Sequence, residues 1–272
     1  MASPYFTMGR PVSGHVEDIV LIHGAWQGAW VWNLFKPVLT GRGWRVHAVD
    51  LPGNGMDQTP PEKVSLDLYV EHVGKLLQRL PGKAVVVGHS GGGIVASQLA
   101  EAFPERIASL VYVAGLMLPS GVTFASLVRR LAQDDPSALG IHPYVEFSAD
   151  GLTSRVQPGA AQRLFLHDCP ADVADAWAAR LKPQPERGRA VAPMLTEARY
   201  GSVPRIYIEP TRDQSITPRV QHLLQALSPG ATRVTIDSGH APQISQPKRL
   251  ADAMTNALAA LDIGPAALMQ AS

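Results

Sequence analysis

The chain has 272 residues, of which 46% are hydrophobic and 17% charged, and its formal net charge is +1. This length suits one large domain, or a core domain that carries an insertion. The near-neutral charge and the lack of basic blocks argue against nucleic-acid binding. No apolar run reaches the roughly 18 residues that a membrane span needs. Because the chain contains one cysteine, Cys169, no intramolecular disulfide can form, and we expect this side chain to be packed rather than reactive.

Both ends of the chain have the character of tails. Residues 1–17 are polar and interrupted by proline and glycine, and they lack the charged and then apolar pattern of a secretory signal. They predict a flexible N-terminal tail, and residues 263–272 predict a C-terminal one. We therefore expect a cytoplasmic protein.

Short apolar runs alternate with amphipathic stretches in the first half of the chain. Strands are expected at residues 18–22, 44–49, 83–88 and 107–114, and helices at 30–39, 65–80 and 91–103. The helix at 65–80 has the clearest apolar stripe, and Ser65 is placed to cap it. Alternation of strands and helices with short connections predicts an α/β fold with a mostly parallel, doubly wound sheet.

This alternation stops at residue 117 and resumes at residue 204. The intervening segment has few strand signals, and its short helical pieces, at 124–133, 160–166 and 172–181, are separated by prolines. A segment of this length is not a simple loop, and we expect it to form a helical cap over one edge of the sheet. Strands at 205–209 and 233–236 and helices at 218–227 and 247–261 then complete the core. The predicted core is thus 18–117 with 204–262, and the predicted cap is 118–203.

One stretch combines a strand, a sharp turn and a helix around a serine. Three valines lead into Gly88-His89-Ser90-Gly91-Gly92, and a helical pattern follows. A serine at the tip of such a turn has a strained backbone, and its hydroxyl projects beyond the sheet edge. Glycines are needed around it because a Cβ there would collide with the neighbouring strand or helix. The backbone N–H of Gly91, at the helix N-terminus, would point at an oxyanion formed on the serine.

A nucleophilic serine needs a base, and reactive groups of an α/β sheet gather beyond the carboxyl ends of its strands. His23, His89 and His240 satisfy this condition. His240 is the best candidate because it lies in a loop after the last strand. The side chain of His89 diverges from that of Ser90, which favours packing support or a pocket wall, and His23 is expected to support its own loop.

The base in turn needs a carboxylate, and Asp50, Asp213 and Asp237 follow strands. Asp213 follows the strand before the one that leads to His240. This gives the order serine, aspartate, histidine that is typical of the architecture. Asp237 and Asp50 both have a local interpretation as turn or cap residues.

The loop after the first strand is expected to supply a second oxyanion donor. The small residues of His23-Gly24-Ala25 would let a substrate carbonyl approach the backbone, and the N–H of Ala25 is the candidate. Trp26 is interpreted as pocket wall, with core packing as the alternative. The cap should shape the acyl and alcohol pockets, and ordinary packing is the alternative interpretation for each candidate lining residue: Met117, Phe124, Phe147, Phe165 and Trp177.

Taken together, the chain resembles an α/β-hydrolase of the branch that contains bacterial carboxylesterases, pyrethroid-type esterases, plant methylesterases and plant hydroxynitrile lyases. The resemblance covers residues 18–262, and it rests on residues 20–26, 88–92, 200–208, Asp213 and Gly239-His240-Ala241-Pro242. It implies the catalytic triad Ser90, Asp213 and His240, and an oxyanion hole formed by the N–H groups of Ala25 and Gly91.

Three positions favour ester hydrolysis within this branch. Hydroxynitrile lyases of this type have a threonine after the first-strand histidine and a lysine after the catalytic histidine, where this chain has Gly24 and Ala241. The lysine charge stabilises a cyanide leaving group, so its absence weakens the lyase interpretation. Cofactor-free dioxygenases of this fold have a histidine on both sides of the serine, whereas Gly91 follows Ser90 here.

The sequence therefore predicts a serine carboxylesterase for small to medium hydrophobic or aryl esters, with no cofactor and no metal. A small-molecule ester is the expected partner, with neither nucleic acid nor membrane, and a homodimer is left open. The alternatives are a hydroxynitrile lyase-like C–C lyase and a slow-turnover ligand receptor on the same scaffold.

Overall fold

The computed structural model describes residues 16–266 of the chain. Most of the two predicted tails, residues 1–15 and 267–272, lies outside these described residues. None of the helices within 16–266 combines the length and the apolar character of a transmembrane helix.

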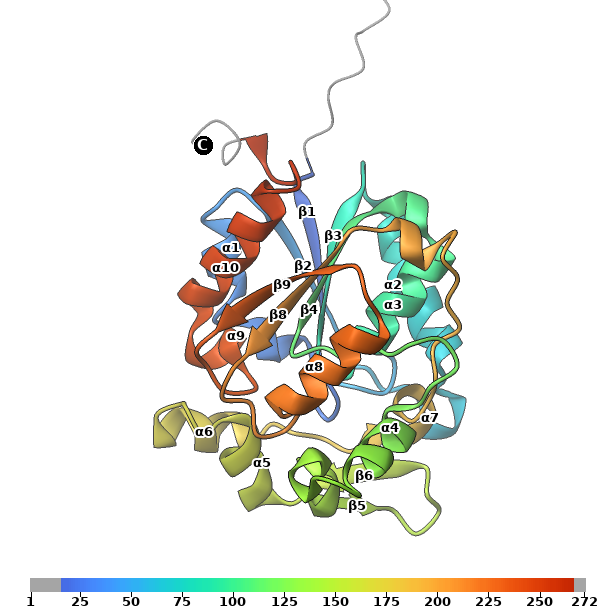
Figure 1. The fold of residues 1–272 in the computed structure, drawn as a ribbon, viewed down its shortest axis with the longest axis vertical. Coiled ribbons are helices and arrows are strands. Elements are labelled where there is room, and N and C mark those ends of the chain that lie inside the picture. The colour runs from blue at the N-terminus through green and yellow to red at the C-terminus, as the bar shows by residue number, and fades with distance from the viewer. Residues whose placement is uncertain (1–15, 267–272) are drawn as a thin grey trace, which may run out of the picture.

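A six-stranded parallel sheet forms the centre of the molecule (Figure 1). Its strands occur in the order β2-β1-β3-β4-β8-β9, and each neighbouring pair is parallel. Their bounds are β1 Asp18–Ile22, β2 Arg45–Val49, β3 Ala84–His89, β4 Ile107–Val113, β8 Arg205–Pro210 and β9 Ala231–Ile236. The first strand of the chain, β1, lies between β2 and β3, so the sheet extends in both directions from β1. This order confirms the predicted α/β fold with a doubly wound sheet.

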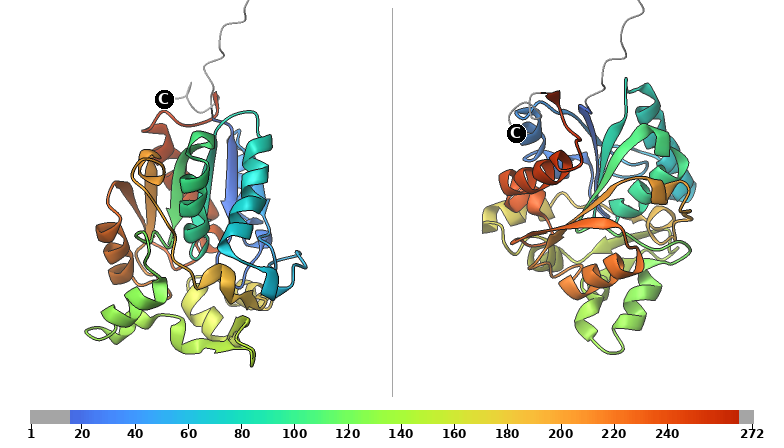
Figure 2. Two further views of the ribbon diagram at one scale, coloured as in Figure 1. Left: turned by 90° about the vertical axis from the view of Figure 1, so that its right-hand side faces the viewer. Right: turned by 45° about the horizontal axis from the view of Figure 1, so that its top comes forward.

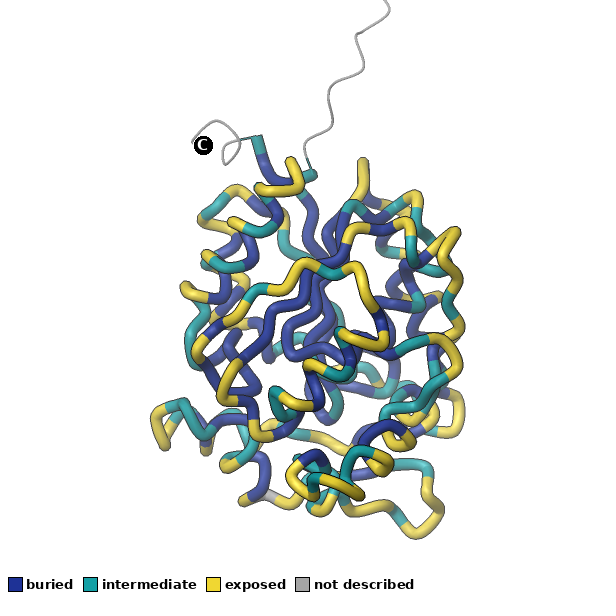
Figure 3. The backbone as a smooth tube through the Cα atoms, viewed as in Figure 1, coloured by how far each residue is buried: buried dark blue, intermediate teal, exposed yellow. Residues whose placement is uncertain are grey.

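Helices cover both faces of this sheet because alternate strand residues point to opposite sides. Val20, Val86 and Tyr112 pack in a cluster with α2, α3 and α8, which span Leu66–Arg79, Gly92–Ala102 and Pro218–Leu227. Ile19 and Val85 pack in a second cluster with α1, Lys36–Thr40, and α10, Pro247–Ala259. Figure 1 shows the two helix layers on either side of the sheet, and the left view of Figure 2 looks onto the layer of α2 and α3. The inner strands β1, β3, β4 and β8 are buried almost throughout, whereas the edge strands β2 and β9 are partly exposed (Figure 3).

The predicted helices agree with the structure except near the N-terminus. Ser65 caps α2 as predicted, since its hydroxyl accepts a hydrogen bond from the N–H of Leu68 at 3.1 Å. The helix predicted at 30–39 is instead a 3₁₀ turn, Ala29–Trp32, followed by the short α1. Pro37 lies in the first turn of α1, where the absence of its N–H removes no helical hydrogen bond. A new helix therefore begins within the range predicted to be one continuous helix.

The segment between β4 and β8 lies over the carboxyl ends of the strands (Figure 1). Its helices are α4 Phe124–Leu131, α5 Pro158–Phe165, α6 Ala171–Ala178 and α7 Glu186–Arg189. It also contains a small antiparallel sheet that was not predicted, formed by β5 Val145–Phe147, β6 Thr153–Val156 and β7 Gln184–Pro185. Strands of two to four residues are too short to show an alternating pattern.

Candidate active site

Ser90 lies in a tight turn between β3 and α3. Its φ of +51° falls in the left-handed region that residues other than glycine rarely adopt. Three backbone hydrogen bonds hold this conformation: the Ser90 N–H donates to the carbonyl of Val113 at 3.1 Å, and the Ser90 carbonyl accepts from Gly93 and Leu116 at 3.0 and 2.9 Å. The strain is therefore maintained by the neighbouring strand end and by the first turn of the helix.

Glycines around this turn allow close backbone contacts. A Cβ on Gly88 would lie 2.7 Å from the carbonyl oxygen of Gly92, and a Cβ on Gly92 would lie 2.6 Å from that of His23. A Cβ on Gly24 would lie 2.9 Å from the Cβ of Ser90. The first-strand loop and the serine turn thus pack backbone against backbone, which places residues 24 and 25 beside the serine.

His240 and Asp213 form a buried pair at the ends of neighbouring strands. The Nδ1 of His240 lies 2.7 Å from Oδ2 of Asp213, and both side chains are almost fully buried. The other carboxylate oxygen, Oδ1, accepts hydrogen bonds from the N–H groups of Ser215 and Ile216 at 2.8 and 2.9 Å. These bonds fix the carboxylate, which holds the imidazole proton on Nδ1 and leaves Nε2 as the acceptor.

The rival histidines are held by hydrogen bonds to neighbouring loops. His23 Nε2 accepts the N–H of Leu51 at 3.1 Å, and its Nδ1 donates to the carbonyl of Gly24 at 2.8 Å. His89 Nε2 donates to the carbonyl of His240 at 3.0 Å. His89 therefore ties the serine turn to the loop that carries His240.

The rival acids also have local roles. The side chain of Asp237 is 66% exposed and pairs with Arg212 at 2.7 Å. Asp50 accepts hydrogen bonds from the N–H groups of Ala29 and Met56 at 2.6 and 3.1 Å, which fixes the turn after β2.

Burial keeps His23 and His89 neutral. It lowers the pKa of His23 below its usual 6.5, and burial together with the nearby His240 lowers the pKa of His89 further. The unfolded histidines take up protons as the pH falls below about 6.5, whereas the folded ones do so only at lower pH. Their contribution to stability is therefore fully present above about pH 6.5 and is lost as the pH falls further. Each such group contributes a slope of at most about 1.4 kcal/mol per pH unit.

We expect the variant His89→Gln to show a shallower loss of stability than the wild type between pH 6.5 and 5.0. Chemical unfolding of both proteins across this range measures the difference. Equal slopes would show that His89 does not contribute to the acid sensitivity.

The backbone N–H groups of Ala25 and Gly91 belong to residues that lie close together beside Ser90. An ideal Cβ on Gly91 would lie 3.5 Å from the nitrogen of Ala25, so the two residues face each other. Within residues 16–266 neither N–H donates to a protein acceptor. Ser90, Ala25 and Gly91 are half-buried, whereas His240 and Asp213 are buried. A pair of unpaired donors next to a serine can stabilise negative charge on an oxygen.

The predicted lining residues fall into two groups. Phe165 is buried, with its ring centroid 5.2 Å from that of His240 and 6.2 Å from that of Trp26. Met117, His89 and Trp26 are also buried in the core beneath the cap, and Phe124 is half-buried against His142 at 5.2 Å.

Phe147 and Trp177 do not fit the predicted lining. Phe147 on β5 is 61% exposed, and Trp177 packs against Trp30 at 5.4 Å and against Arg180. Both lie in short cap elements, where the sequence does not distinguish an inward-facing aromatic from an outward-facing one. Sequence reasoning also missed Gln184, a buried cap residue that bonds to the Ala25 loop, because no motif marks it.

A parallel sheet with a strained serine turn, and an aspartate and a histidine at the following strand ends, defines an α/β hydrolase. A sequence profile of the alpha/beta hydrolase family matches residues 19–253, so the chain belongs to that family. Within the family it belongs to the esterase-like branch, as the following relatives indicate. It is 30% identical to a pyrethroid hydrolase of Sphingobium wenxiniae, over 89% of this chain and 87% of the relative. It is 29% identical to Methylesterase 8 of Arabidopsis thaliana, over 87% of each chain. The crystal structure of polyneuridine aldehyde esterase, 25% identical, matches 89% of this chain and 99% of its own with a TM-score of 0.79.

Proposed function

We propose that this protein is a serine carboxylesterase that hydrolyses small to medium hydrophobic or aryl esters through an acyl-enzyme. One observation carries the proposal: the buried His240–Asp213 pair, the strained Ser90 turn and two unpaired N–H groups lie at adjoining loops. Ester hydrolysis needs these three parts, namely a nucleophile, an oriented base and an oxyanion site. The esterase names of the relatives support the same reaction class.

The proposed reaction begins with attack of Ser90 Oγ on the ester carbonyl carbon while Nε2 of His240 takes the serine proton. Asp213 stabilises the resulting imidazolium, and the N–H groups of Ala25 and Gly91 stabilise the oxyanion. The tetrahedral intermediate collapses, the carbon–oxygen bond to the alcohol breaks, and His240 gives its proton to the leaving alkoxide. Water then attacks the acyl-enzyme with His240 as base, which releases the acid and restores Ser90.

The surroundings of Gly24 favour this reaction over carbon–carbon cleavage. A Cβ at this position would lie 2.9 Å from the Cβ of Ser90 and 3.2 Å from Nδ1 of His89. A threonine here, as in the lyases of this branch, would therefore require the loop to shift away from the serine. Residue 241 is a buried alanine, which offers no cation to a cyanide leaving group.

The cap segment 118–203 is proposed to select the ester. Phe165 from α5 packs beside the rings of both His240 and Trp26, so an apolar side chain adjoins the proposed base. Such a side chain favours hydrophobic acyl or alcohol groups of modest size.

Hydrolysis of p-nitrophenyl acetate and p-nitrophenyl butyrate tests the proposal. We expect turnover of about 1–10³ per second, and labelling by a fluorophosphonate that peptide mapping locates on Ser90. Rapid labelling with negligible turnover across a broad ester panel would instead support a ligand receptor. Release of cyanide from mandelonitrile above the background rate would support a lyase.

A further inference from the structure

Trp26, the residue directly after the proposed oxyanion donor Ala25, is held by the cap through all of its polar groups. Its N–H donates to Oε1 of Gln184 at 3.1 Å, and its carbonyl accepts from the N–H of Lys182 at 2.9 Å. Its indole N–H donates to Oγ of Ser154 at 3.0 Å. The φ of Trp26 is +62°, which a bulky side chain adopts only when its surroundings enforce it.

The amide of Gln184 is buried and has a fixed orientation. Its Nε2 donates to the hydroxyl of Tyr69 at 3.2 Å and to the carbonyl of Pro185 at 2.9 Å. The Tyr69 hydroxyl also accepts from Nδ2 of Asn54 at 2.8 Å. With Nε2 occupied in this way, only the amide oxygen can face Trp26, and Gln184 is 3% exposed, so water does not compete for the bond.

The indole of Trp26 is held by a second chain of contacts from the cap. Ser154 donates to the Glu186 carboxylate, which pairs with Arg189 through two hydrogen bonds of 2.9 and 2.7 Å. The Arg189 guanidinium in turn lies 5.2 Å from the Trp26 ring centre. The cap thus fixes both the backbone and the side chain of this tryptophan.

A small cavity shows how near Gln184 lies to the oxyanion site. It has a volume of about 20 Å³, and its walls include Ala25, Gly91, Tyr69, Gln184 and Arg189. This space suffices for about one water molecule. Gln184 therefore adjoins both proposed oxyanion donors without touching the reacting atoms.

We propose that Gln184 is a positioning residue that sets the direction of the Ala25 N–H through its hydrogen bond to Trp26. This inference rests on the proposed function of Ala25 as an oxyanion donor. A different contact joins the turn that carries Ser90 to the loop that carries His240. It is the hydrogen bond from His89 to the carbonyl of His240, and it lies within the core. Loss of Gln184 should therefore disturb the oxyanion hole and leave the nucleophile and the base in place.

The variant Gln184→Met keeps the length of the side chain and removes its hydrogen bonds. We expect its kcat/KM for p-nitrophenyl butyrate to fall about 10- to 100-fold, somewhat less than for outright loss of an oxyanion donor. KM should change by less than about threefold, because the ground-state carbonyl needs the donor less than the oxyanion does. The inhibition constant of a trifluoromethyl ketone, which forms a tetrahedral adduct, should rise by the same factor as kcat/KM falls.

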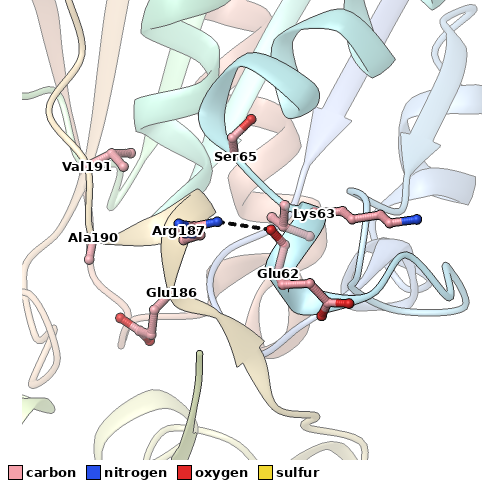
Figure 4. A pocket seen from close by; sticks show the side chains of 8 residues that line it. Glu62, Lys63, Ser65, Glu186, Arg187, Ala190 and Val191 are labelled. Carbon is pink, nitrogen blue, oxygen red and sulfur yellow. Dashed lines mark hydrogen bonds between the residues drawn. The ribbon is translucent and has the colours of Figure 1, made fainter. Parts of the chain in front are cut away.

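Arg187→Met is the matched control. The Nη1 of Arg187 donates to the carbonyl of Glu62 at 3.0 Å, which is another contact between cap and core on the same segment (Figure 4). It borders a separate pocket of about 560 Å³ and has no bond to the Ala25 loop. We expect its kcat/KM and its ketone inhibition constant to stay within about threefold of the wild-type values, the usual scale for a contact outside the site.

Several outcomes would overturn the inference. Unchanged kinetics in Gln184→Met would do so, as would a fall in kcat/KM without weaker ketone binding, or an equal loss in the control. If Gln184→Met does not fold, Tyr69→Phe removes one of the two acceptors of the amide nitrogen. This variant should show a smaller loss of kcat/KM, matched by an equal rise in the ketone inhibition constant. The proposed function itself fails in a different way, since the wild type would then be inactive or Ser90→Ala fully active.

Discussion

Replacing Ser90 with alanine should lower kcat for p-nitrophenyl butyrate by about 10⁴- to 10⁶-fold. The substitution removes the oxygen that forms the acyl-enzyme and leaves the base without a proton to take. The two N–H groups at Ala25 and Gly91 remain, so a small residual rate above that in water is expected. Ester hydrolysis and fluorophosphonate labelling, measured on the folded variant, check both expectations.

Ser97→Ala controls for the loss of a buried hydroxyl. Ser97 lies in α3, two turns after the nucleophile, where its Oγ donates to the carbonyl of Gly93 at 2.9 Å and pairs with the Tyr112 hydroxyl at 2.8 Å. This variant is expected to lose stability by about 1 kcal/mol and to keep its turnover. Full activity in Ser90→Ala would refute the serine mechanism.

Asp213→Asn should lower kcat by about 10⁴-fold without unfolding the protein. The asparagine oxygen can still accept the N–H groups of Ser215 and Ile216, so its NH₂ group would face Nδ1 of His240. The imidazole would then carry its proton on Nε2 and could not accept one from Ser90. We expect the loss in kcat with little change in KM, because the substrate does not contact the carboxylate.

Asp237→Asn is the matched control for this change. Asp237 lies three residues before His240 in the sequence, but its exposed carboxylate pairs with Arg212. Such a surface pair contributes little, and kcat should stay within about threefold of the wild-type value. A large loss in Asp237→Asn with none in Asp213→Asn would reassign the acid.

The core of the fold could be predicted from the sequence because its inner strands β1, β3 and β4 are short and mostly apolar. In a parallel sheet such runs end at one edge, so the residues that follow them share a neighbourhood. Position at the strand ends therefore narrows the candidates to Ser90, three histidines and three aspartates, and chain order and loop context then favour Asp213 and His240. The structure brings these two side chains within 2.7 Å of each other. Their catalytic roles stay predictions until the variants above are measured.

The cap could not be predicted at the same level because its contacts are set by tertiary packing. Strand β7 has two residues, one of them proline, and only its pairing with β6 defines it. Gln184 within it acquires its importance from a loop 158 residues away in the sequence. The same lack of local signal means that the sequence does not distinguish Phe147 and Trp177 from inward-facing residues and does not mark Gln184.

The contacts of Trp26 affect how this protein could be redesigned. Because the cap segment is proposed to select the ester, exchanging the whole cap for that of a relative is an obvious route to a new substrate range. Here the exchange would also remove Ser154, Lys182 and Gln184, which hold the backbone and indole of Trp26. A chimaera should therefore keep Ser154, Lys182 and Gln184 unchanged and exchange only cap residues that do not contact Trp26.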